Sequence, residues 1–244
     1  MFEQDVSVTT NYGRMPAFAV CPSQDGQWPL ILFYMDAPGY REELKHMARR
    51  IAKQGYYVLL PDLYYRLGTI RFDLPRRDET MSAVIRPCIA HAMNRQQIID
   101  DTGAAIAFAD GQSQAKPGPV GAVGYCMGGP FIVWAAGAFA DRIVAAGSLY
   151  GVRLVNELDQ SPHLWVGQVK AELYFGFADQ DPASPPDKVE IFTKAMEEGG
   201  VNHRVEWLDD TRHGFCFPER GAFKPAAAEQ VWTRLFDLWK RNLG

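Results

Sequence analysis

The clearest candidate for chemistry is Cys126, within Gly124-Tyr125-Cys126-Met127-Gly128-Gly129. An apolar run precedes this segment and a helix is predicted after it, which is the context of a nucleophile elbow with cysteine in place of serine. Glycines two residues to either side let the strand and the helix approach without Cβ clashes. The start of a helix favours a thiolate, and the Met127 N–H is placed to donate to a developing oxyanion. The pattern predicts a nucleophilic thiol.

Two other interpretations of this segment were weighed. Cys126 could be a small core residue beside a tight turn, because free cysteine is among the most buried residue types. A dinucleotide-binding glycine fingerprint is the second alternative. It fails because Ala122 stands where a triplet with Gly124 as its second glycine needs its first.

A nucleophilic thiol needs a base, and the base needs a carboxylate to orient it. Asp179 follows the apolar run 171–175, and His213 follows the run that ends at Leu208. Both come just after predicted strands, where open α/β sheets place their sites, and the chain order nucleophile, acid, histidine fits this elbow. We therefore predict His213 as the base and Asp179 as the acid. The second choice of acid is Asp181.

The elements that must position these residues alternate along the chain. Apolar runs predict strands at 6–10, 15–21, 29–34, 56–60, 120–123, 143–150, 171–175 and 203–208. Helical spacing predicts helices at 42–54, 98–109, 127–139, 186–198 and 226–242. Such alternation predicts a mostly parallel sheet with helices on both faces. No repeat or long linker divides the chain, so we expect a single domain over 1–244.

One segment, 64–95, has no clear period. It carries six arginines against three acidic residues. Loops of this length inside a domain are usually functional, and arginines bind carboxylates in a bidentate manner. The segment is therefore a candidate substrate-binding region for an anion, although its arginines could equally form a solvated surface.

Composition excludes several classes of function. The net charge is −4 and there is no basic stripe, so we expect no nucleic-acid partner. The longest apolar stretch, 131–140, is about half of what a membrane span requires, and the first residues do not read as a signal peptide. Four cysteines at irregular spacing fit neither a disulfide framework nor a zinc site. We expect free thiols in the cytoplasm, no metal and no cofactor. The oligomeric state, monomer or dimer, stays open.

At this point the sequence resembles the dienelactone hydrolase family of α/β-hydrolases over most of its length. The specific parts are the Cys126 elbow, Pro61-Asp62-Leu63-Tyr64, the Asp179 loop, His213-Gly214-Phe215 and the final helix with Trp232. The resemblance implies the α/β-hydrolase fold and a Cys-His-Asp triad that hydrolyses small lactones or esters through an acyl-enzyme. It also implies a cytoplasmic role in degrading aromatic compounds.

The resemblance also assigns roles around the thiol. It implies that Ala37, in the loop Met35-Asp36-Ala37, supplies a second oxyanion N–H beside that of Met127. Asp36 stands where the family has a glutamate that holds the resting thiol, so it is implied to modulate Cys126, with a side chain one methylene shorter.

Family members bind a substrate carboxylate with two arginines. The candidates for the first are Arg76, Arg77 and Arg86. The second would lie a few residues after His213, where this chain has no arginine until Arg220. Phe215 and Phe217 in that stretch indicate either an aromatic-lined pocket or core packing.

Other functions fit the same residues. A thioesterase, amidase or peptidase would use the same triad, because fold and triad do not fix the acyl substrate. A non-enzymatic protein with a redox-sensing Cys126 is the remaining alternative, although it would not need Asp179 and His213 at strand ends.

Overall fold

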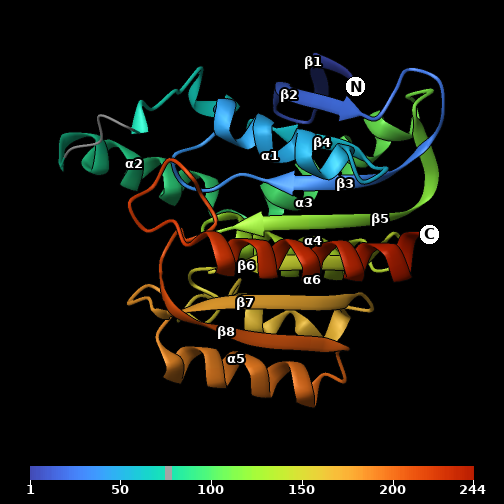
Figure 1. Cartoon of the computed structure of the whole chain (residues 1–244). Coiled ribbons are helices and arrows are strands. Elements are labelled where there is room, and N and C mark those ends of the chain that lie inside the picture. Colours follow the sequence, from blue (N-terminus) through green and yellow to red (C-terminus); the bar gives the residue numbers. More distant parts are fainter. Residues whose placement is uncertain (75–78) are drawn as a thin grey trace.

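A central sheet carries the molecule. In residues 1–74 and 79–244, which the computed structural model describes, eight strands form one sheet in the order β1-β2-β4-β3-β5-β6-β7-β8 (Figure 1). The strands are β1 (Phe2–Thr10), β2 (Gly13–Cys21), β3 (Trp28–Tyr34), β4 (Tyr57–Pro61), β5 (Ala115–Tyr125), β6 (Ile143–Leu149), β7 (Glu172–Gln180) and β8 (His203–Arg212). The pairs β1/β2 and β2/β4 are antiparallel, and the other neighbours are parallel. This is an α/β-hydrolase fold, and the predicted fold class is confirmed.

Helices cover both faces of this sheet. The longer helices are α1 (Glu42–Ala52), α2 (Glu79–Ala92), α3 (Arg95–Asp110), α4 (Gly128–Ala138), α5 (Pro186–Glu198) and α6 (Pro225–Leu243). In Figure 1, α1 and α6 lie in front of the sheet and α3 and α4 lie behind it. Helix α4 is apolar on every side because it is buried from Gly128 to Gly137. It packs against β5 and β6, which fixes the position of the elbow that precedes it.

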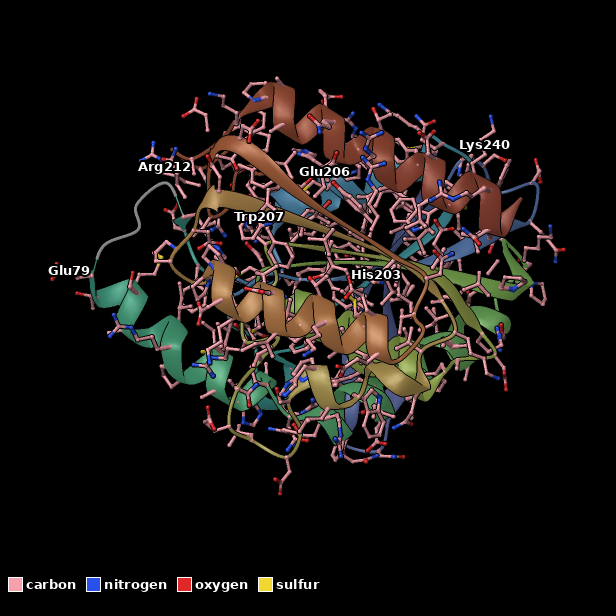
Figure 2. The ribbon with its side chains drawn as sticks, turned by 90° about the horizontal axis from the view of Figure 1, so that it is seen from below. Glu79, His203, Glu206, Trp207, Arg212 and Lys240 are labelled. Atoms are coloured by element: carbon pink, nitrogen blue, oxygen red, sulfur yellow. The ribbon has the colours of Figure 1, made fainter. Side chains whose placement is uncertain are left out.

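The carboxyl edge of the sheet is the edge that matters for function. The arrows of β3 and β5 point toward the side where α2 lies (Figure 1). Figure 2 shows that Arg212, the last residue of β8, and Glu79, the first of α2, lie toward the same side, whereas Lys240 of α6 lies toward the opposite one. The loops that follow the parallel strands therefore meet on the α2 side.

The segment 64–95 is more regular than its sequence indicates. It contains a 3-10 turn at Tyr65–Leu67 and the helix α2. The helical period is weak because Pro87 lies inside α2, where only Ile85, Cys88 and Ala92 are buried. Some of its arginines are structural, since Arg66 pairs with Asp101 at 2.7 Å and Arg71 with Asp62 at 2.7 Å.

No helix in the described residues combines the length and the apolar composition needed to cross a bilayer.

Candidate active site

Cys126 lies in a sharp turn between β5 and α4. Its φ of 54° is in the left-handed region, which is unusual for a residue with a Cβ and is a form of strain found at functional sites. A Cβ at Gly124 would overlap the carbonyl of Gly128, and one at Gly128 would lie 2.7 Å from the Tyr34 oxygen. Both glycines are therefore required by this close approach of strand and helix. Cys126 is 8% exposed, so access to it is narrow.

The structure places Asp181, not Asp179, against His213. The His213 Nδ1 and the Asp181 Oδ2 are 2.6 Å apart, and the other oxygen of Asp181 accepts from the Ala183 N–H at 2.9 Å. The Asp181 side chain is fully buried. Asp181 was the second choice from sequence, and it is the carboxylate that contacts His213.

The prediction for Asp179 is wrong. Its two oxygens accept from the backbone N–H groups of Asp210 at 2.9 Å and Thr211 at 2.8 Å, which lower the pKa of its carboxyl. The physical reason is the length of β7. The strand continues to Gln180, with a shift of register against β8 after Ala178, so Asp179 still belongs to the strand and Asp181 is the first residue beyond it.

His213 lies between a carboxylate and the thiol. Burial opposes its positive charge, but hydrogen bonds to Asp181 and Cys126 outweigh burial and raise the pKa of His213 to about 10. Since Nδ1 is taken by Asp181, Nε2 is the nitrogen left for the thiol. The ring of Tyr150 meets the imidazole edge to face, with the ring centroids 5.0 Å apart, and restricts its rotation. The base is thus held on two sides.

The two backbone groups proposed for an oxyanion flank the elbow. Within residues 1–74 and 79–244, neither the Met127 N–H nor the Ala37 N–H donates to a backbone carbonyl. The end of β3 lies directly against the elbow, because a Cβ at Gly128 would meet the oxygens of both Tyr34 and Met35. The Met127 and Ala37 segments therefore both lie next to the elbow.

Asp36 is fully buried beside two arginines. It forms an ion pair with Arg41 at 2.5 Å and another with Arg220. Arg41 also pairs with Glu43 at 2.5 Å. Both carboxylate oxygens are therefore occupied, and among the described residues no hydrogen bond joins Asp36 to Cys126. The structure does not bring Asp36 to the thiol as the resemblance implies.

The residues that were predicted to bind substrate differ in where the structure places them. Phe215 and Phe217 are both 0% exposed, so the prediction that they line a pocket is wrong and the packing alternative holds. They contact Tyr150 and Tyr125, with centroids 5.2 and 5.3 Å apart. Arg86 is exposed on α2. Arg76 and Arg77 lie outside the described residues.

Sequence reasoning did not single out a cation beside the elbow. The Val152 N–H donates to the Cys126 carbonyl at 3.2 Å, and the next residue, Arg153, has a φ of 56°. Arg153 lines a cavity of about 150 Å³ together with Ser184 and Lys188 of the loop and helix that follow β7. Among the described residues no carboxylate lies within ion-pair distance of Arg153. The left-handed backbone of Arg153 distinguishes this residue in the structure, but no sequence pattern predicts such a conformation at a residue other than glycine.

In residues 1–74 and 79–244, no group of three or more His, Cys, Asp or Glu side chains is arranged to hold a metal ion.

Comparisons with known proteins match the chain along most of its length. A model of the dienelactone hydrolase family matches residues 15–243. A protein of Methylorubrum extorquens, provisionally named a carboxymethylenebutenolidase, is 28% identical over 244 residues, which cover 98% of this chain and 81% of that protein. A protein of Synechocystis with the same provisional name is 26% identical over 251 residues, with 98% and 96% covered.

Solved structures show the same fold. A provisionally named dienelactone hydrolase of Klebsiella pneumoniae superposes with a TM-score of 0.86 at 20% identity, and 98% of each chain is covered. The dienelactone hydrolase of Anabaena variabilis gives a TM-score of 0.67 at 18% identity, with 99% of this chain and 98% of that one covered.

Proposed function

The chain belongs to the dienelactone hydrolase family and is a hydrolase, and from this we propose that it cleaves small lactones or esters through an acyl-enzyme on Cys126. His213 is the general base and acid, and Asp181 is the carboxylate that orients it. The observation that carries this proposal is the 2.6 Å contact of His213 with Asp181, on an imidazole whose pKa is raised by Asp181 and by Cys126, the residue of the left-handed elbow.

The reaction follows from these positions. The Cys126 sulfur attacks the carbonyl carbon, its proton resides on His213, and the carbonyl oxygen becomes an oxyanion that the N–H groups of Met127 and Ala37 stabilise. When the C–O bond breaks, His213 gives its proton to the departing oxygen, which in a lactone stays attached to the acyl group. A water then attacks the thioester while His213 takes its proton, and the acid leaves as the thiol is restored.

An anionic group on the substrate is supported by the charge beside the elbow. Arg153 and Lys188 share one cavity between the loop after β6 and the segment after β7, where the Ser184 hydroxyl donates to the Gly151 carbonyl at 3.0 Å. A cavity of about 150 Å³ accommodates a group of the size of a carboxylate.

All four cysteines are unpaired, which supports the proposal of a reducing, cytoplasmic location.

The experiment is steady-state hydrolysis of a dienelactone and of a neutral aryl ester, followed by ultraviolet absorbance. Cys126→Ala is expected to lower kcat by about a thousandfold or more on every substrate the wild type accepts. Cys88→Ala removes a thiol from α2 and serves as the matched control with unchanged turnover. Full activity in Cys126→Ala overturns the nucleophile. Wild-type turnover of the neutral ester alone keeps the mechanism and rejects the anionic substrate.

A further inference from the structure

A buried phenol connects the two sides of the predicted oxyanion site. The Tyr64 hydroxyl donates to the Ala37 carbonyl at 2.7 Å and lies 3.5 Å from the Met127 sulfur. Tyr64 is 0% exposed, and it follows β4, a strand that contributes none of the triad residues. One side chain therefore contacts both residues whose N–H groups are assigned to the oxyanion.

The Ala37 segment is held at three points. The Gly39 N–H donates to the Asp36 carbonyl at 2.9 Å, the Asp36 side chain pairs with two arginines, and Tyr64 holds the Ala37 carbonyl. A trans peptide directs its N–H opposite to its carbonyl, so the Ala37 N–H points away from the turn that Gly39 closes. Of these three restraints, only the Tyr64 hydroxyl also touches Met127.

The packing around the ring keeps the phenol in this position. Gly39 has a φ of 78°, and a Cβ there would lie 3.0 Å from the Tyr64 ring, so the loop packs directly against this ring. Burial raises the pKa of Tyr64 well above its usual value, so the hydroxyl remains a neutral donor. A fixed donor that needs no reorganisation is what preorganised oxyanion stabilisation requires.

We propose that Tyr64 is a positioning residue of the oxyanion site, which sets the Ala37 N–H relative to the Met127 N–H through its hydrogen bond to the Ala37 carbonyl. This inference rests on the proposed function. It assigns Tyr64 no contact with substrate, and it predicts a defect in acyl transfer while the thiol keeps its own reactivity.

The test is Tyr64→Phe, which removes one oxygen and keeps the ring. Losing an oxyanion donor costs roughly a hundredfold or more in kcat, and a displaced donor costs part of that. We therefore expect kcat for an ester or lactone to fall about tenfold, with KM changed by less than about twofold. Tyr65→Phe is the matched control, because the adjacent Tyr65 hydroxyl bonds Thr10 and Asp101, at 2.8 Å each, away from the elbow. It is expected to turn over at the wild-type rate.

Alkylation of Cys126 by iodoacetamide separates positioning from damage to the fold. Displacement of iodide forms a C–S bond without a tetrahedral oxyanion, so the alkylation rate of Tyr64→Phe should equal that of the wild type. Wild-type kcat in Tyr64→Phe overturns the inference, as does an alkylation rate that falls together with kcat. If no substrate shows Cys126-dependent turnover even in the wild type, the proposed function itself fails, and this inference fails with it.

Discussion

Two buried carboxylates, one in the loop after β3 and one in the loop after β7, differ in their partners. On one side Asp181 contacts His213, a base whose proton can leave. On the other side Asp36 contacts Arg41 and Arg220. Both aspartate side chains have no exposed surface, so burial does not distinguish them. The partners distinguish the two aspartates, because an imidazole changes its charge at accessible pH and a guanidinium does not.

One region therefore holds a titratable imidazole, and the other holds guanidinium groups that stay charged. Burial opposes the charge on Arg41, but Asp36 and Glu43 outweigh burial and raise its pKa, so the arginine remains protonated. The two guanidinium groups also lie over the ring of Phe217, at 5.0 and 4.9 Å from its centroid. The Asp36 side is therefore an ionic frame under the loop that carries Ala37, while the Asp181 side holds the imidazole that we propose as the base.

The largest expected effect lies on the Asp181 side. Asp181→Asn keeps the size of the side chain but favours the wrong tautomer of His213, so kcat should fall by about a hundred- to ten-thousandfold. Asp179→Asn provides the matched control two residues away, and its kcat should remain within about threefold, because Asp179 accepts from the backbone N–H groups of Asp210 and Thr211 and, among the described residues, has no hydrogen bond to His213. Steady-state kinetics of both variants on one substrate gives the two kcat values to compare. The reverse ranking of the two variants would restore Asp179 as the acid.

The Asp36 side should show its effect in stability. Asp36→Asn leaves the buried guanidinium of Arg220 without its carboxylate, and breaking such a pair costs about 3 kcal/mol in the free energy of unfolding. Asp5→Asn breaks the ion pair between Lys45 and the Asp5 carboxylate, which is 72% exposed. This change should lower the free energy of unfolding by less than about 1 kcal/mol. Urea unfolding measures both. Alkylation of Cys126 should proceed at the wild-type rate in Asp36→Asn, and faster alkylation would show that Asp36 masks the thiol.

The residues predictable from sequence are those fixed by local geometry. Gly124 and Gly128 surround Cys126 within one turn, so the elbow was recognisable without any knowledge of the tertiary structure. His213 follows its strand directly and was equally accessible. The alternation of strands and helices likewise predicted the fold, because the pattern of burial along each element is local.

What sequence could not predict depends on pairing between distant segments. The choice between Asp179 and Asp181 depends on where β7 stops pairing with β8, which is a matter of register. The contact of Arg220 with Asp36 joins residues 184 positions apart. Phe217 follows the histidine closely, yet it is buried under guanidinium groups from both ends of the chain.

The smallest expected effect is a difference in pH dependence between the two sides. The pKa of His213 is about 10 in the folded protein against 6.5 as its ordinary value, so between these values the folded state binds more protons. Its stabilising contribution is complete below about pH 6.5 and is lost as pH rises toward 10. Measuring this in Cys126→Ala removes the thiol and leaves Asp181 as the group that raises the pKa of His213. The difference in unfolding free energy between Cys126→Ala and Cys126→Ala with His213→Asn should then fall above pH 6.5, by at most about 1.4 kcal/mol per pH unit.

The difference in unfolding free energy between wild type and Asp36→Asn should not change with pH over the same range, because guanidinium groups remain protonated there. A slope on the Asp36 side would show that a titrating group, and not a fixed ionic frame, lies beneath the Ala37 loop.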